Sequence, residues 1–274
     1  MSRLISVITT TYNAENTVED TILSVLNQKG VELEYVIVDD GSTDKTLDVM
    51  KRYSDPRIHI FEAGRVGRGN ALNIGIANST GKYIAILDAD DVSHPYRLKT
   101  QLVVMEQHEE IDVLGTDKIR IWDKQVPAWG TIFTGNVDHC ELVDVSNRFL
   151  YNSPIFHSSA FMRKKMLLKV NCYDKYRKDR IEWDLFIKIS AVNGGLFNLS
   201  VPLVARRLHK NQCFENKKRI RYIISGLKLQ GKAFRTFNKC RIMYLILPCL
   251  FMYHLLPLRL RILFRDYYMN HLIK

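Results

Sequence analysis

Cysteine is scarce in this sequence, and its spacing excludes two common roles. Five cysteines stand among 274 residues without C-x-x-C spacing, which argues against a zinc site and against a disulfide framework. They are Cys140, Cys172, Cys213, Cys240 and Cys249. A chain that is 46% hydrophobic can build a full core without such staples. Residues 1–13 enter an apolar segment at once, without a secretory leader, so we expect a cytoplasmic protein with reduced thiols.

Acidic residues are almost absent from the last quarter of the chain. Residues 206–274 contain 16 lysines and arginines against two acids, a net charge of +14, whereas residues 1–205 have a net charge of −3. The two parts together give the formal net charge of +11. A nearly neutral body with a basic tail indicates a catalytic part joined to a part that attracts anions.

The basic tail also lacks an apolar run of full membrane-spanning length. Residues 242–258 contain no charged side chain, but these 17 residues include two prolines and fall short of the roughly 20 required, so we expect no span. Basic clusters flank apolar faces, which is typical of helices lying on an anionic membrane. A helical appendage packed on the body and a dimer interface are the alternatives. No nucleic-acid recognition motif accompanies the positive charge.

Strand and helix patterns alternate in the first half of the chain. Short β-rich segments are separated by segments whose apolar residues recur at helical intervals. Strands are expected at residues 4–10, 34–40, 57–63 and 82–91, and helices at 18–28, 44–53, 67–79 and 181–192. After Trp122 the pattern weakens into loops and short strands. The alternation predicts an α/β fold, with a Rossmann-like, mostly parallel sheet flanked by helices and followed by a basic helical extension.

Two clusters of carboxylates follow strands of this expected sheet. Asp39-Asp40 ends the second strand, and Asp88-Ala89-Asp90-Asp91 ends the fourth. Because ligands bind at the carboxyl ends of parallel strands, both clusters should face one crevice. Three acids within four residues repel one another unless a cation offsets them, and Mg²⁺ or Mn²⁺ binds carboxylates together with phosphate oxygens. The alternative is an exposed acidic turn that caps the helix near Pro95.

Several segments in a fixed order resemble glycosyltransferases of family 2, which have the glycosyltransferase A fold. The segments are VITTTYNAENTVEDTILSVLNQ, EYVIVDDGSTDKTLDVM, GRGNALNIGIANSTGKYIAILDADD, NSPIFHSSAFMRKKMLLKVNCYD and IEWDLFIKI. The resemblance covers roughly residues 4–210. It implies a catalytic domain at residues 1–210, with a nucleotide-sugar half at 1–122 and an acceptor half at 123–210, before a helical appendage at 211–274.

The resemblance implies a set of residues that bind the nucleotide-sugar donor. They are Thr11, Tyr12, Asn13, Glu15, Asp39, Arg68, Asp88 and Asp90. The first three match the family's T-Y-N element beside base and ribose, and Asp39 matches the acid that recognises the base by accepting the uracil N–H. Asp40 is expected to support the turn at residues 41–42. Arg68, at a glycine-rich helix start, is placed to meet the diphosphate, and a solvated surface arginine is the alternative.

The same resemblance implies the metal ligands and the acceptor side. Asp88 and Asp90 match the family's D-x-D pair, with Asp90 as the direct ligand, and His209 matches a position near the diphosphate or the metal. Asp91 is expected to support them. The general base is assigned to Glu182, with Asp184 as the alternative, because Ile181-Glu182-Trp183-Asp184 departs from the usual Glu-Asp opening of this helix. His157 is placed on the acceptor side, and an ordinary polar strand is its alternative.

These expectations combine into an inverting, metal-dependent transfer of a hexose or N-acetylhexosamine. The donor is a nucleotide-sugar, expected to be a UDP-sugar, and the acceptor is a glycan, expected to be lipid-linked, in surface polysaccharide biosynthesis. The enzyme would lie in the cytoplasm, peripherally on the inner face of the plasma membrane, with its oligomeric state open. A metal-dependent nucleotidyltransferase and a non-catalytic membrane or nucleic-acid adaptor are the alternatives. A dinucleotide oxidoreductase is disfavoured, because no strand–GxGxxG–helix unit opens the chain.

Overall fold

The computed structural model describes residues 4–129, 140–146, 148, 153–208, 219–237 and 252. The chain divides into two compact units. The first consists of Met1–Phe149 and Ser153–Gln212, and the second of Leu150–Asn152 and Cys213–Lys274. The strands described below belong to the first unit, which also holds the candidate site.

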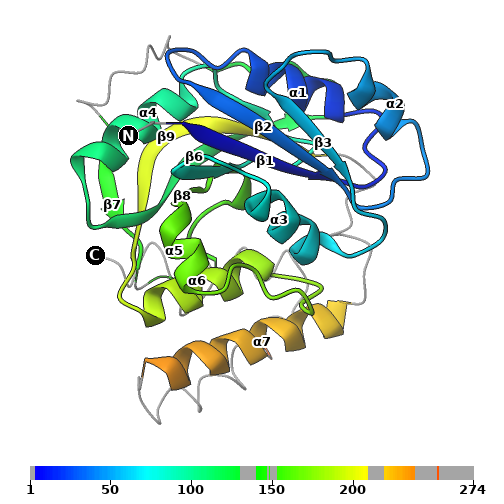
Figure 1. Cartoon of the computed structure of the whole chain (residues 1–274). Helices are drawn as coiled ribbons and strands as arrows, with labels where there is room; N and C mark the ends of the chain where they lie inside the picture. The colour runs from blue at the N-terminus through cyan, green and yellow to red at the C-terminus, as the bar shows by residue number, and fades with distance from the viewer. Residues whose placement is uncertain are drawn as a thin grey trace. The chain divides into compact units, whose positions relative to one another are not determined.

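A mixed sheet forms the centre of the first unit (Figure 1). Among the described residues it has nine strands, in the order β3-β2-β1-β4-β8-β6-β9-β5, with β7 paired to β9. The strands are β1 (Ile5–Thr11), β2 (Leu33–Asp39), β3 (Ile58–Glu62), β4 (Tyr83–Ile86), β5 (Val92–Ser93), β6 (Ile111–Trp122), β7 (Leu142–Asp144), β8 (Phe161–Arg163) and β9 (Gly195–Leu208).

The first four strands are parallel, as the alternation predicts. β1 lies between β2 and β4, and β2 pairs with β3. The three connections contain α1 (Val18–Leu26), α2 (Thr46–Lys51) and α3 (Arg68–Ala77). Because these strands run in one direction, β1, β2 and β4 end at one edge of the sheet, and the segments that follow them meet there.

Helices cover both faces of the sheet (Figure 1). Alternate strand residues point to opposite faces, so Ile8, Val36 and Ile84 join one buried cluster while Val7, Tyr35 and Ala85 join the other. The first cluster includes residues of α3, α5 (Lys164–Lys169) and α6 (Ile181–Ala191). The second includes residues of α1, α2 and α4 (Arg97–Gln107).

The second half of the sheet, after the region where the sequence pattern weakens, mixes strand directions. β8 runs antiparallel to both β4 and β6, and β5 and β7 run antiparallel to β9. β6 and β9 are long and parallel to each other over eleven residue pairs, with register shifts near Thr116 and Asp117. The fold is therefore α/β with a mixed sheet.

The second unit contributes one described helix, α7 (Arg219–Thr236). Its Ile223, Leu229, Ala233 and Phe234 are buried, whereas Ile224 is exposed, which is the spacing of an amphipathic helix. Among the described residues, no helix combines the length and apolar composition that a membrane span requires. The uncharged segment 242–258 lies outside the described residues except for Met252.

Candidate active site at the carboxyl ends of β1, β2 and β4

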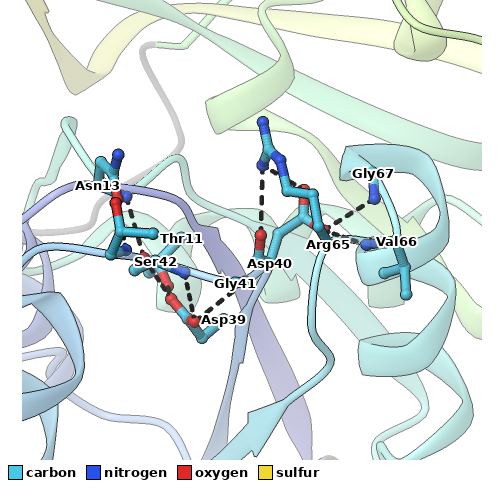
Figure 2. A network of polar contacts seen from close by, with 10 residues as sticks. Thr11, Asn13, Asp39, Asp40, Gly41, Ser42, Arg65, Val66 and Gly67 are labelled. Carbon is cyan, nitrogen blue, oxygen red and sulfur yellow. Dashed lines mark hydrogen bonds and ion pairs between the residues drawn. The ribbon is translucent and has the colours of Figure 1, made fainter.

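Asp39, the last residue of β2, holds together the loop that follows it (Figure 2). Its carboxylate accepts hydrogen bonds from the backbone N–H groups of Gly41 and Ser42 at 3.1 and 2.8 Å. The Ser42 and Thr11 hydroxyls donate to its other oxygen at 2.5 and 2.9 Å. Only 2% of Asp39 is exposed, so these four donors satisfy an otherwise costly buried charge.

Asp40 organises a different loop from the one the sequence suggests. One carboxylate oxygen accepts from the backbone N–H groups of Val66 and Gly67, both at 2.8 Å, and the other pairs with Arg65 at 2.9 Å (Figure 2). The turn at residues 41–42 is bonded to Asp39 instead. Asp40 therefore ties β2 to the start of α3, where Gly67 takes a φ of 88° that favours glycine.

The T-Y-N segment after β1 lies against this same loop. Asn13, in the left-handed region at φ 52°, accepts a hydrogen bond from the Thr43 N–H at 2.8 Å. Glu15 accepts from the Lys45 N–H at 3.0 Å. Tyr12 is 43% exposed, and the Arg65 guanidinium stacks 3.4 Å from its ring centroid. An exposed aromatic ring backed by a cation is a surface on which a planar base can stack.

The loop after β4 gathers three carboxylates. One oxygen from each of Asp88, Asp90 and Asp91 lies within 4.8 Å of the others, a spacing that one cation can bridge. Burial and the charges of Asp90 and Asp88 raise the pKa of Asp91 well above its usual range. Oxygen-only ligands on a crowded rim fit a hard divalent ion, Mg²⁺ or Mn²⁺. The residues present therefore fit the divalent metal expected from the sequence.

Asp91 is the most deeply held member of the cluster. It is 2% exposed, accepts a hydrogen bond from the Ser158 hydroxyl, and accepts another from the Arg207 N–H at 3.0 Å. The Arg207 guanidinium donates to the Asp90 carbonyl at 3.1 Å and pairs with Asp20 at 2.7 Å. Strand β9 thus holds the loop with the three carboxylates in place, a role of Arg207 that the sequence does not predict.

Arg68, the first residue of α3, joins the acid cluster to His157. Its guanidinium lies 2.5 Å from Asp88 and 2.9 Å from Nδ1 of His157. Its side chain is 47% exposed. Partial desolvation works against its charged form, but the charges of Asp88, Glu182 and Asp90 more than offset this and raise the pKa of Arg68. Burial likewise opposes ionisation of Asp88, and Arg68 and His157 together hold its pKa well below the usual range.

His157 belongs to this network and not to a polar strand. It lies in η2 (His157–Ser159), a 3₁₀ turn, is 6% exposed, and contacts the Tyr173 hydroxyl at 2.9 Å through Nε2. Its Nδ1 is also 3.5 Å from Asp88. Burial raises the pKa of Tyr173, so the phenol stays neutral. The structure places His157 beside Arg68 and Asp88, and its expected role on the acceptor side stays a prediction.

Glu182 stands in the first turn of α6. Arg180, at the N-terminus of this helix, has a left-handed φ of 49°. The charge of Glu182 contributes to the raised pKa values of both Arg68 and Tyr173, which places it in the same electrostatic neighbourhood. Asp184 is 2% exposed and lies 3.8 Å from Arg177. Glu182 is half-buried, whereas Asp184 is buried in the packing of α6.

The structure therefore brings most of the expected residues to one edge of the sheet. Asp88, Asp90, Arg68 and His157 form one connected group, whereas Thr11, Asn13 and Asp39 join the loop after β2. His209 lies outside the described residues, and its role stays a prediction. Arg65, Tyr173 and Arg207 were not anticipated, because their partners lie far away along the chain.

Known proteins share this architecture. A glycosyltransferase of Haemophilus influenzae, itself uncharacterized, is 32% identical over 219 residues, covering 76% of this chain and 67% of the relative. TuaG of Bacillus subtilis, a glycosyltransferase named for teichuronic acid biosynthesis, is 42% identical over 105 residues, 37% of this chain and 42% of TuaG. Residues 1–349 of S. aureus TarS, solved with UDP-GlcNAc, superpose with a TM-score of 0.66 at 21% identity.

These matches differ in what they establish. The TarS superposition covers 85% of this chain and 66% of that one, and at its low identity it shows the fold alone. The chain spans about two thirds of the length of the Haemophilus relative and of the TarS structure. The model of the family described as glycosyl transferase family 2 matches residues 6–171, which include both acid clusters. On that match and on the Haemophilus relative, the chain belongs to glycosyl transferase family 2.

Proposed function

We propose that this chain transfers a hexose or N-acetylhexosamine from a nucleotide-sugar to a glycan, with inversion at the anomeric carbon. The observation that carries the proposal is a cluster of three carboxylates, one of which, Asp88, pairs with Arg68 at the start of α3. A diphosphate needs both a divalent ion and fixed positive charge, and this edge of the sheet offers ligands for the first and supplies the second. UDP is the favoured nucleotide, in line with the donor bound to TarS.

The donor half holds the diphosphate and prepares it to leave. Asp88 and Asp90 would hold the metal, with Asp91 behind them against Ser158 and Arg207. A bound divalent ion supplies Lewis-acid stabilisation of the departing diphosphate. Arg68 binds the same diphosphate, with His157 fixing the position of its guanidinium. The Tyr12 ring, supported by Arg65, stacks against the base.

Glu182 is proposed as the general base. It takes the proton of the acceptor hydroxyl while that oxygen attacks the anomeric carbon from the face opposite the diphosphate, so no covalent intermediate forms. Asp184 is less suited to this role, because it is buried and lies near Arg177. A buried, ion-paired carboxylate braces the helix and does not reach an acceptor.

The acceptor is proposed to be a lipid-linked sugar of a surface polysaccharide. The name of TuaG, which refers to teichuronic acid biosynthesis, supports such a product. The basic C-terminal region is proposed to contact the inner face of an anionic membrane, since residues 206–274 have a net charge of +14. The enzyme would then meet its acceptor at the membrane surface while the donor stays in the cytoplasm.

The first test is a screen of nucleotide-sugars for slow, metal-dependent hydrolysis by the full chain. A glycosyltransferase releases nucleoside diphosphate, whereas a nucleotidyltransferase releases pyrophosphate, so the product identifies the reaction class. Hydrolysis of a UDP-sugar that stops with EDTA and returns with Mn²⁺ or Mg²⁺ is the expected result. Pyrophosphate as the product would overturn the proposal.

The second test examines the base. Glu182→Gln should lower turnover by about 10³-fold, because a positioned base contributes roughly 10²- to 10⁴-fold, and should leave donor affinity within a few-fold. Glu141→Gln, an exposed acid in the same half of the chain, is the matched control and should retain turnover. Wild-type turnover in the Glu182 variant would refute the assignment, and loss in an Asp184→Asn variant alone would transfer the role to Asp184.

A further inference from the structure

A second group of cations lies on the ladder between β6 and β9, outside the acid cluster. The Lys118 ammonium is 4.6 Å from the centroid of the Phe156 ring, and the Arg206 guanidinium is 5.8 Å from the same centroid. Arg120 is paired in register with Arg206 across the two strands. We call Lys118, Arg120, Arg206 and Phe156 the β6–β9 basic cluster.

The cluster contains more positive charge than its surroundings neutralise. Throughout the part of the chain that the structure describes, no carboxylate lies within 4.0 Å of any of its three cations. Lys118 is exposed, but partial desolvation, then the charges of Arg206 and Arg120, lower its pKa, and the more distant acids Asp117 and Asp91 do not offset them. Like charges that lie around one ring repel one another, and a bound anion would offset this repulsion.

Chain connectivity places the cluster beside the carboxylate loop after β4. Phe156 directly precedes His157, whose Nδ1 is 3.5 Å from Asp88. Arg206 directly precedes Arg207, whose N–H donates to Asp91. The charge of Asp91 is also felt at Lys118. A molecule seated on the cluster would therefore lie next to the group that we propose holds the donor.

From this arrangement we infer that the β6–β9 basic cluster binds a phosphate group of the acceptor. The inference rests on the proposed function, which it extends by naming the acceptor as an anionic, phosphate-bearing molecule. Arg206 offers a planar fork of donors for two phosphate oxygens, and Lys118 adds a mobile ammonium from the neighbouring strand. Phe156 supplies an apolar surface against which the carbon skeleton next to the phosphate packs. The phosphate can belong to a lipid diphosphate or to a phosphodiester-linked chain.

Binding of phosphate probes to the full chain tests the inference. Farnesyl diphosphate and a tri(glycerol phosphate) are titrated by calorimetry in excess EDTA and without nucleotide, so that no metal-bound diphosphate contributes. We expect the double variant Lys118→Gln/Arg206→Gln to bind the preferred probe at least tenfold more weakly than the wild type. Lys165→Gln removes one exposed lysine from α5 and is the matched control, with unchanged affinity expected.

The outcomes separate the sources of the phosphate and the two proposals. Preference for farnesyl diphosphate indicates a lipid-linked acceptor, and preference for the glycerol phosphate trimer indicates a polymer. Equal affinity of wild type and double variant for both probes overturns the inference. Phosphatidylglycerol vesicles are titrated in parallel, and a loss of affinity confined to them also overturns the inference, because it would assign the cations to the membrane surface. Failure of the wild type to hydrolyse any nucleotide-sugar would instead contradict the proposed function. This assay is independent of the titrations.

Discussion

Asp39-Asp40 and Asp88-Ala89-Asp90-Asp91 occupy equivalent places in the sheet. Each follows a strand that is parallel to β1, on one side or the other, so both clusters lie at the same edge. The first pair is nevertheless satisfied from within the protein. Asp39 accepts four hydrogen bonds, and Asp40 accepts two backbone bonds besides its ion pair with Arg65. These two carboxylates stabilise the conformations of the loops that bond to them.

In the second cluster the carboxylates lie close to one another, whereas in the first cluster hydrogen bonds and an ion pair compensate each carboxylate. Asp91 sits beside two other carboxylates, and its pKa is raised well above its usual range by burial and by their charges. Burial opposes the ionisation of Asp88, but Arg68 and His157 lie against it and hold its pKa well below the usual range. Position at a strand end therefore does not by itself determine the role of an acid. The two clusters differ in the spacing of their carboxylates, because one oxygen from each of Asp88, Asp90 and Asp91 lies within 4.8 Å of the others.

Asp90→Asn should give the largest effect and should separate the two clusters most clearly. Loss of one ligand should lower metal-dependent hydrolysis of the donor by about 100-fold or more. Stability without metal should be unchanged or slightly higher, because one of three repelling charges is gone. Initial rates at several Mn²⁺ concentrations and thermal unfolding in EDTA measure the two quantities. A wild-type rate in this variant would contradict the assignment of Asp90 as a metal ligand. A marked loss of stability would show that Asp90, like Asp39, stabilises the fold.

Asp39→Ala should have the opposite profile. Removing the acceptor of four buried hydrogen bonds should lower the free energy of unfolding by about 2–4 kcal/mol, measured by urea denaturation. Asp39→Asn, which keeps one oxygen acceptor, should fall between this variant and the wild type. If stability were unchanged and only the affinity for UDP fell, Asp39 would be the base-recognising acid that the family resemblance implies, and the comparison would fail.

Gly41→Ala tests whether the backbone of the loop after β2 also contributes to stability. Gly41 has a φ of 77°, and an added Cβ would lie 3.0 Å from the backbone nitrogen of Arg65. We expect a loss of about 1–2 kcal/mol in the free energy of unfolding. Gly64→Ala is the control, since its φ of 66° carries the same backbone cost but no atom lies within 4 Å of its Cβ. Equal losses in both variants would show that the close contact with Arg65 contributes nothing.

Asp55→Asn should give the smallest effect, because this acid has a single partner and partial exposure. Hydrogen bonds from Arg57 lower the pKa of Asp55 from 3.8 to about 2. A lowered carboxyl pKa stabilises the fold above the unfolded-state value, and this stabilisation is lost as pH falls from about 4 toward 2. The side chains are 26% and 38% exposed, so solvent screening should limit the loss at pH 7 to about 1 kcal/mol. A loss that persisted at pH 2 would contradict this account.

The first half of the fold was predictable from the sequence because its signals are local. Apolar runs and helical spacing place β1 to β4 and the helices between them, with ends that shift by a few residues, as in α1, which ends at Leu26. The mixed second half was not predictable in the same way. The pairing of β6 with β9 joins residues about 85 apart, and spacing within either strand does not reveal its partner.

The candidate site shows the same division. The D-x-D pair and Arg68 could be named from motifs, and the structure brings them together. The loop-building role of Asp39 and the position of His157 depend on donors and acceptors from distant segments. Arg207 gave no sequence signal at all, since its bonds to Asp20 and to the acid cluster form only after the chain has folded.

The clamp formed by Arg207 has a consequence for the order of folding. It joins α1, the carboxylate loop after β4 and β9, which are separated by up to 187 residues along the chain. Contacts of such long sequence separation form slowly, because the intervening chain must first lose its freedom. We therefore expect the loop of acids to become ordered only after β9 has docked. A partly synthesised chain that lacks β9 would then not bind a divalent cation at the acid cluster. Affinity for the cation would appear only when the domain is complete.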